Sequence, residues 1–279
     1  MTIPIVFNDT YFEKIDSGDK AYWLGFLYAD GYVRKKKKSA QFKLKLCVKD
    51  KMHIEKLKND LKSNHSIIDG VEYFRKGGRE YEAHFSMMNI YSVKLVNDLI
   101  NFGCVEAKTQ KIRFPEFLDD YIYHFIRGYF DGDGCIYKNK NRPNSFSITI
   151  VSNKIFINSM KEFLKMGIIR DYKNYSILGI SKINDVKKFR DLIYKNASRF
   201  LERKRVIFDK IVNEFKRDYS LTKNKKTYYV SDTNGNMFIV PHLRKFCEEN
   251  NLVFSTMSNL SRGIGKTCRG WKCNKFENI

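Results

Sequence analysis

Residues 23–31 of this chain read WLGFLYADG, and residues 126–134 read IRGYFDGDG. Both stretches are predicted to be short helices that are apolar on nearly every side and end in an Asp-Gly pair. The two aspartates, Asp30 and Asp133, are 103 positions apart (133 − 30), which leaves room for one repeated supersecondary unit. A helix that is apolar all round must be buried on all sides. The sequence therefore predicts a duplicated core helix that twice delivers a carboxylate to the same end.

Two such helices bury the most surface by packing on each other, and Gly25 and Gly128 have no side chains to hold their backbones apart. The C-terminal end of each helix carries about half a negative charge from its aligned peptide dipoles. Asp30 and Asp133 add carboxylates there, so the sequence predicts a concentration of negative charge that a divalent cation would offset. Oxygen-only ligands favour magnesium, manganese or calcium over zinc.

The two nonapeptides resemble those of the LAGLIDADG homing endonucleases, position by position. The third position is glycine, the seventh is small, and the eighth and ninth are Asp-Gly. The sixth position differs between the two copies. These positions are occupied by Gly25 and Gly128, Ala29 and Gly132, Asp30-Gly31 and Asp133-Gly134, and at the sixth by Tyr28 and Asp131.

The resemblance implies a metal site at the two helix ends. It assigns Asp30 and Asp133 as catalytic metal ligands and includes Gly31 and Gly134 in the metal site. The implied cofactor is Mg²⁺, with Mn²⁺ as a substitute and Ca²⁺ binding without cleavage.

The chain has 279 residues, with 52 Lys and Arg against 31 Asp and Glu, a net charge of +21 and a pI near 9.6. This excess indicates a polyanionic partner, and nucleic acid is the commonest one. Anionic membrane is the rival, but the sequence has no apolar run of about 18 residues and no apolar signal core. Six cysteines without a C-x-x-C pair indicate reduced thiols. We expect no membrane partner, no secretion, and a location in the cytoplasm of a bacterial or phage-infected cell or in an organelle.

Strand and helix patterns follow each nonapeptide in the same order. Residues 41–48 and 145–152 alternate apolar and polar side chains, which predicts half-buried strands. Helices are predicted at residues 52–61, 92–102, 155–164 and 184–194, and further strands at 71–75, 81–87, 169–172 and 176–181. We predict an α+β fold. The resemblance implies two pseudo-symmetric αββαββα units, residues 1–110 and 111–214, fused in one chain that forms a DNA-binding saddle.

Polar positions of the predicted strands are candidates for DNA contact, because a two-stranded ribbon fits the major groove. A solvated face is the alternative. The run of five basic residues at 34–38 follows a carboxylate that would face a phosphodiester, so phosphate contact is preferred to a solvated turn. The candidates in these segments are Arg34, Lys35, Gln41, Lys43, Lys45, Ser145, Ser147 and Thr149.

Each predicted unit ends in a basic cluster. The resemblance implies a lysine near the scissile phosphate from about this place, which suggests Lys108 and Lys204. A cation there would stabilise charge that develops on the phosphate. We expect a long, pseudo-palindromic double-stranded DNA target, a monomeric enzyme, and a double-strand break with short 3′ overhangs.

Residues 215–227 are charged and are predicted to be a linker. Residues 228–279 are predicted to form a separate basic module with two strands and two short helices, the second capped by Ser255. Two helices across a tight turn suggest a helix-turn-helix, and the stretch that ends at Trp271 resembles the NUMOD-type modules of phage and intron-encoded nucleases. Zinc binding by His242, Cys247, Cys268 and Cys273 is conceivable, although the spacings fit no common finger. The exposed candidates for DNA contact are Thr256, Ser258, Asn259, Arg262, Lys266 and Arg269.

The leading hypothesis is a metal-dependent, site-specific homing endonuclease encoded in an intron or a free-standing gene. The alternatives on the same fold are an RNA maturase and a DNA-binding regulator that does not cleave. Retention of Asp30 and Asp133 favours cleavage, because a pure binding protein gains nothing from clustered like charges.

Overall fold

The computed structural model describes residues 4–37, 39–138, 146–214 and 227–275. The chain divides into two compact units, Met1–Glu214 and Phe215–Ile279. Within the described ranges, no helix is long and apolar enough to cross a lipid bilayer. Ser145 and residues 215–226 of the predicted linker lie outside the described residues.

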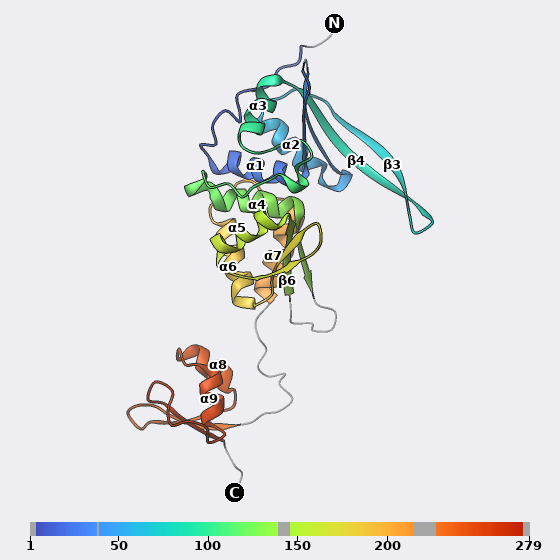
Figure 1. Ribbon diagram of the computed structural model, residues 1–279. Helices are drawn as coiled ribbons and strands as arrows, with labels where there is room; N and C mark the ends of the chain where they lie inside the picture. Colours follow the sequence, from blue (N-terminus) through green and yellow to red (C-terminus); the bar gives the residue numbers. More distant parts are fainter. Residues whose placement is uncertain (1–3, 38, 139–145, 215–226, 276–279) are drawn as a thin grey trace. The chain divides into compact units, whose positions relative to one another are not determined.

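The first unit is a mixed α+β structure in which one order of elements occurs twice (Figure 1). Its strands form two four-stranded antiparallel sheets of matching order, β1-β2-β4-β3 and β5-β6-β8-β7. The first run comprises α1 (Gly18–Asp30), β1 (Gly31–Lys35), β2 (Ala40–Cys47), α2 (Lys51–Asp60), β3 (Ile67–Lys76), β4 (Arg79–Tyr91) and α3 (Val93–Asn101). The second comprises α4 (Ile122–Asp133), β5 (Gly134–Lys138), β6 (Phe146–Ser152), α5 (Lys154–Leu164), β7 (Ile168–Asp171), β8 (Ser176–Ile180) and α6 (Ile183–Tyr194).

Helices α1 and α4 lie against each other at the centre of this unit (Figure 1). Their backbones meet at the two glycines: a Cβ on Gly25 would lie 2.0 Å from the carbonyl oxygen of Phe125, and one on Gly128 would lie 1.9 Å from that of Tyr22. Every residue of α1 from Ala21 to Ala29 is buried. The prediction that two core helices pack on each other through glycine is confirmed. The side chain of Ser17 caps α1 by accepting a hydrogen bond from the N–H of Lys20.

The period-two prediction is also confirmed, since β2 alternates buried Phe42 and Leu44 with half-buried Gln41 and Lys43. The predicted strand at residues 41–48 runs one residue too far, because Val48 begins a 3-10 turn and is exposed. Two strands were not predicted. β1 and β5 start directly after the aspartate helices, and the basic run at 34–38 begins inside β1 rather than in a turn.

A further helix, α7 (Glu202–Glu214), was not predicted either, since its start was interpreted only as a basic cluster. Phe208 on α7 is fully buried in the main core. The segment around its start is also held to the first run of elements by ion pairs from Arg199 to Asp60 and from Arg203 to Asp50, at 2.7 and 3.0 Å. Helix α7 therefore belongs to the first unit as a structural element.

The second unit contains a three-stranded antiparallel sheet of order β10-β9-β11 and two short helices. Its separate core includes Val230, Met257 and Cys273. The predicted strands and helices are present, but Ser255 does not cap the second helix, which begins at Phe254 with Val253 before it. The final strand was not predicted. The elements are β9 (Tyr228–Ser231), β10 (Met237–Val240), α8 (Leu243–Glu249), α9 (Phe254–Leu260) and β11 (Lys272–Lys275).

Replacing Gly25 or Gly128 with alanine should destabilise the fold by about 3 kcal/mol or more, because overpacking against backbone cannot be relieved by moving a side chain. The measurement is the free energy of unfolding in urea. Gly179→Ala is the matched control, since a Cβ there would meet its nearest atom at 3.7 Å. Equal stability of Gly25→Ala and Gly179→Ala would contradict the backbone contact.

Candidate active site at the adjoining helix ends

Each central helix passes into a strand without an intervening loop. The N–H of Gly31 donates to the carbonyl oxygen of Leu27, and that of Gly134 donates to Phe130. Both glycines have extended backbone angles, so the chain changes from helix to strand within one residue. The aspartate before each glycine is thereby fixed at the last helical position, at the negative end of the helix dipole.

The two carboxylates come together at these ends. A Cβ on Gly132 would lie 3.2 Å from Oδ2 of Asp30 and 2.2 Å from the Cβ of Ala29, so Asp30 lies against the end of α4. Both aspartates are accessible to solvent. The surrounding protein still displaces much of the water around Asp30, and this burial, with the negative charge of Asp133, raises the pKa of Asp30 to about 6. Burial also raises the pKa of Asp133.

Lys108 and Lys204 occupy matching places behind the helix ends. Nζ of Lys108 donates to the carbonyl oxygens of Leu27 and Gly31, at 3.0 and 2.6 Å. Nζ of Lys204 donates to four carbonyl oxygens at the end of α4, including those of Phe130 and Gly134, at 2.7 and 2.6 Å. Burial lowers the pKa of both lysines, that of Lys204 to about 8. Each lysine thus holds a cation at the negative end of one central helix.

The sequence predicted that a divalent cation would offset the negative charge at the helix ends. In the structure, two lysines offset part of that charge. Lys108 and Lys204 lower the pKa of Asp30 and of Asp133, so they offset part of the repulsion without metal. The carbonyl oxygens of Gly31 and Gly134 each use a lone pair to accept from a lysine. The two carboxylates remain as the anionic oxygen donors of the site.

Tyr129 is a site residue that the sequence reasoning missed. Its hydroxyl donates to the carbonyl oxygen of Val151 at 3.0 Å, and its polar contact with Asp133 lowers the pKa of that carboxyl group. The side chain itself is buried. A tyrosine in a helix predicted to be buried was the available signal, because a buried hydroxyl needs a partner.

Tyr28 and Asp131, at the sixth positions of the two nonapeptides, have equivalent structural roles. Tyr28 donates a hydrogen bond, whereas Asp131 accepts one. The hydroxyl of Tyr28 donates to the carbonyl oxygen of Phe102 at 2.5 Å, on the segment that leads to Lys108. Oδ2 of Asp131 accepts from the N–H of Leu201 at 2.8 Å, directly before the helix that carries Lys204. Each residue ties the lysine-bearing segment to its own central helix.

Asp131 also joins a buried network across the two helices. Its Oδ2 accepts from the hydroxyl of Tyr22 at 2.9 Å, and that hydroxyl lies 2.8 Å from Nε2 of His53. Burial lowers the pKa of His53 to about 3, so the ring is neutral and Nε2 carries the donating hydrogen. Burial raises the pKa of Asp131 to about 6, and its Oδ1 has no partner among the described residues. The network is closed to solvent and is structural.

The candidate DNA-contact residues of β1 and β2 mostly share one face. Arg34 pairs with Gln41 across the strands, and Lys43 and Lys45 alternate on the same side. Lys35 falls on the opposite side by strand alternation. Ser147 and Thr149 are half-buried on β6, on the side that alternates with its buried residues.

In the second unit, the prediction of exposed contacts on α9 is wrong for Thr256, Ser258 and Asn259, which are half-buried. Oδ1 of Asn259 accepts from Arg262 at 2.6 Å, and Arg269 donates to the carbonyl oxygen of Asn251 at 2.8 Å. Arg262, Lys266 and Arg269 are exposed. No cluster of three or more histidine, cysteine or acidic residues suited to a metal occurs in the described part of the chain.

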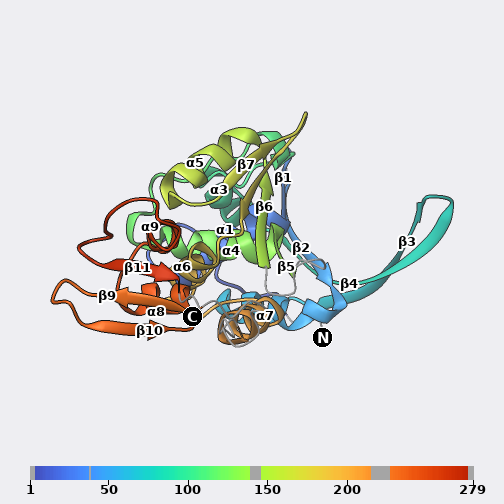
Figure 2. The ribbon, with the colours of Figure 1, turned by 90° about the horizontal axis from the view of Figure 1, so that it is seen from below.

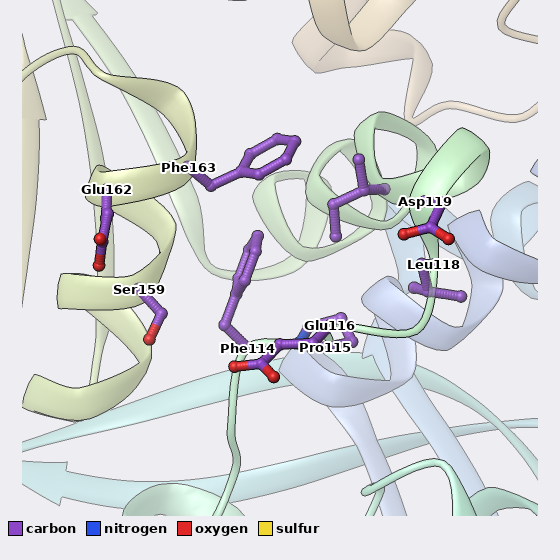
Figure 3. A pocket seen from close by; sticks show the side chains of 9 residues that line it. Phe114, Pro115, Glu116, Leu118, Asp119, Ser159, Glu162 and Phe163 are labelled. Carbon is purple, nitrogen blue, oxygen red and sulfur yellow. The ribbon is translucent and has the colours of Figure 1, made fainter.

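A surface pocket of about 470 Å³ lies elsewhere, between the loop before α4 and helix α5 (Figure 3). The rings of Phe114 and Phe163 face each other there, at 5.8 Å. The carboxylates of Glu116, Asp119 and Glu162 also line it. This acidic lining repels phosphate, so the pocket is poorly suited to nucleic acid.

Comparison with known proteins gives one family match. Residues 120–194, from just before α4 to the end of α6, match the model of the LAGLIDADG-like domain. No curated protein matches the chain.

Several solved structures are similar to this chain. The LAGLIDADG meganuclease I-AabMI bound to uncleaved DNA is 15% identical over 72% of this chain and 94% of that chain, with a TM-score of 0.48. The LAGLIDADG homing endonuclease I-GzeII in complex with its DNA target is 14% identical over 73% and 93%, with a TM-score of 0.49. The homing endonuclease I-LtrWI bound to target DNA is 16% identical over 77% and 94%, with a TM-score of 0.49.

The raised pKa of Asp30 predicts a stabilising substitution. A carboxyl group whose pKa is higher in the folded state stabilises the fold at low pH, and this stability is lost as pH rises from about 4 to about 6. Asp30→Asn should therefore raise stability at pH 7 in a chelator by about 1 kcal/mol, a value discounted for solvent access. At pH 4 the gain should vanish. Thermal unfolding at both pH values measures it, with the exposed Asp9→Asn as control, and equal gains at both values would contradict the prediction.

Asp131 can be tested by two substitutions of similar size. Asp131→Leu leaves the N–H of Leu201 and the hydroxyl of Tyr22 without an acceptor and should cost about 2 to 4 kcal/mol. Asp131→Asn keeps one oxygen for both donors and removes a buried charge, so its stability should stay within about 1 kcal/mol of wild type. Urea unfolding distinguishes them. Equal destabilisation by both would show that the oxygen acceptor is not what matters.

Proposed function

We propose that this chain is a metal-dependent DNA endonuclease of the LAGLIDADG homing type. The observation that carries the proposal is the meeting of Asp30 and Asp133 at the ends of two helices packed backbone to backbone, with Lys108 and Lys204 behind them. The match of residues 120–194 to the LAGLIDADG-like domain supports it. A buried structural pair would not leave both carboxylates accessible to solvent.

The residues present fit a magnesium site. Asp30 and Asp133 supply hard carboxylate oxygens. Burial and the negative charge of Asp133 raise the pKa of Asp30, and a bound cation would offset that negative charge. Mg²⁺ commonly binds one or two carboxylates and completes its shell with water and substrate phosphates. Mn²⁺ would substitute, and Ca²⁺ would bind without supporting cleavage. When bound, the metal makes water more acidic and neutralises charge on the phosphate.

The protein's own residues would then supply positive charge at fixed positions. Lys108 and Lys204 are each held by main-chain carbonyls, so their cations are fixed in place before the substrate arrives. Such fixed charges stabilise negative charge that develops on a phosphate without reorganising. Tyr129 lies beside Asp133 and lowers the pKa of that carboxyl group, in opposition to the effect of burial. With one carboxylate serving each strand, the product is a double-strand break with short 3′ overhangs.

We assign DNA binding to the polar faces of the two sheets. On this proposal the two runs of elements are pseudo-symmetric units, residues 1–110 and 111–214, that form a saddle over a long, pseudo-palindromic duplex. Gln41, Lys43 and Lys45 face the groove from β2, and Ser147 and Thr149 from β6. The enzyme acts as a monomer, because both carboxylates come from one chain.

The second unit would add DNA contacts through a NUMOD-like, helix-turn-helix-like module. Residues 228–279 form this module on the proposal, and residues 215–227 link it to the nuclease. Arg262, Lys266 and Arg269 are its exposed cations. The proposal places the protein in the cytoplasm or an organelle, encoded with an intron or by a free-standing gene.

Asp30→Asn and Asp133→Asn should each lower the cleavage rate by about a thousandfold, since loss of one carboxylate removes several kcal/mol of transition-state stabilisation. DNA affinity should stay equal or rise through lost repulsion. Cleavage of a duplex library in magnesium measures the rate, and gel shift in a chelator measures the affinity. Asp9→Asn is the control.

Three outcomes of that experiment have different meanings. Undiminished metal-dependent cutting by either variant would refute the site. Binding of duplex DNA by the wild type without any cutting would favour the regulator, and a preference for structured intron RNA over duplex DNA would favour the maturase.

A further inference from the structure

The β3–β4 hairpin is the most asymmetric feature of the first unit. It projects well beyond the rest of the unit (Figures 1 and 2). Its strands have 10 and 13 residues, whereas β7 and β8 in the second run have 4 and 5. From residue 71 to residue 82 every position of the hairpin is exposed, so this part contributes nothing to the core.

Strand register shows where the two hairpins diverge. In the second run, the stacked rings of Tyr172 and Tyr175 end the hairpin, at 4.8 Å. When β4 and β8 are aligned through their ladders with β2 and β6, Phe85 on β4 corresponds to Tyr175. β4 extends from Phe85 out to Arg79, and the stacked pair Phe74 and Tyr81 lies on this extension, at 5.6 Å.

The extension continues the face proposed to bind DNA. Lys45 pairs with Met87 on β4, and alternation along β4 places Phe85, Tyr81 and Arg79 on that same side. Glu72 is also on this side, but its charge is neutralised by Lys45 at 2.6 Å. Phe74 and Lys76 are cross-strand partners of Tyr81 and Arg79 and therefore share the face. An open depression of about 590 Å³ lies among the tip residues Phe74, Lys76, Gly77, Arg79 and Tyr81.

The opposite side of the same extension has no excess of positive charge. Arg75 donates two hydrogen bonds to Glu80, at 2.8 and 2.6 Å, and His84 lies 2.6 Å from Glu82. Lys76 and Arg79, in contrast, have no ion pair within the part of the chain that the structure describes. The two sides of one hairpin thus differ in charge, and the cationic side is continuous with the proposed DNA face.

We propose that the β3–β4 extension binds the duplex beyond the reach of the second run of elements, so that the enzyme contacts its target unequally on the two sides. This inference rests on the proposed function. Lys76 and Arg79 contact phosphates, and the rings of Phe74 and Tyr81 lie against the groove wall. From Phe85 to Arg79 the strand covers about 20 Å at about 3.4 Å per residue. A ribbon that winds with the groove over this length spans on the order of four base pairs.

The first test uses two arginines of the hairpin as a matched pair. Arg79→Ala should weaken binding to a duplex about fivefold at about 0.15 M salt and reduce the slope of log K against log salt by about 0.9. Lys76→Ala with Arg79→Ala should double the change in slope and weaken binding about 30-fold. Arg75→Ala removes the same side chain from the opposite face and should change the slope little. Equal effects of Arg75→Ala and Arg79→Ala would overturn the inference.

The second test locates the contact. Duplexes with a randomised centre are selected on the full wild-type chain, and hydroxyl-radical footprints are compared for the wild type and the Lys76→Ala, Arg79→Ala double variant. Protection should extend on the order of four base pairs further on one side of the cleavage position, and the double variant should lose protection at that end only. If the wild type cleaves DNA but its footprint is symmetric, the inference is overturned. The same holds if the footprint of the double variant is unchanged. Failure of the wild type to bind or cut any duplex would overturn the proposed function and the inference together.

Discussion

The contact between the backbones of α1 and α4 is the constraint on which the rest of the structure depends. Gly25 meets the main chain of Phe125, and Gly128 meets that of Tyr22, so no side chain separates the helices at the crossing. The same close approach continues to the helix ends, where Ala29 lies under Gly132. A larger residue at any of these places would separate the two carboxylates. Small residues along the crossing therefore serve the site as much as the core.

Close approach creates an electrostatic problem, because two carboxylates and the negative ends of two helix dipoles meet in one place. Two lysines offset part of this negative charge. They are themselves costly to bury, as their lowered pKa values indicate. Their ammonium groups are satisfied by main-chain carbonyls, not by the carboxylates. The positive charge thus lies behind the helix ends and leaves the carboxylates open in front. An anionic site that stays accessible and partly balanced is suited to hold a cation against a phosphate.

The sequence was informative where burial imposes a pattern. Two largely apolar helices with matched glycines indicated paired core helices, and alternation identified β2 and β6. β1 and β5 were missed because Gly31 and Gly134 turn the chain from helix to strand in one residue, without a loop composition to mark the change. Helix α7 was missed because the charges around Lys204 mask the buried side chain of Phe208. The places of the two lysines came from family resemblance, since their carbonyl partners are set by tertiary structure and leave no local signal.

The sixth positions of the nonapeptides show why matching two halves residue by residue can mislead. Tyr28 and Asp131 differ in size, charge and hydrogen-bonding polarity, and from sequence the pair is a departure from symmetry. In the structure each residue forms a hydrogen bond to the main chain of a segment that carries a lysine to the helix end. Tyr28 donates to a carbonyl oxygen, and Asp131 accepts from an N–H. The main chain offers both kinds of group, so either side chain can hold such a segment. The two halves therefore share a hydrogen bond from the central helix to the lysine-bearing segment. The residue that forms this hydrogen bond differs between them.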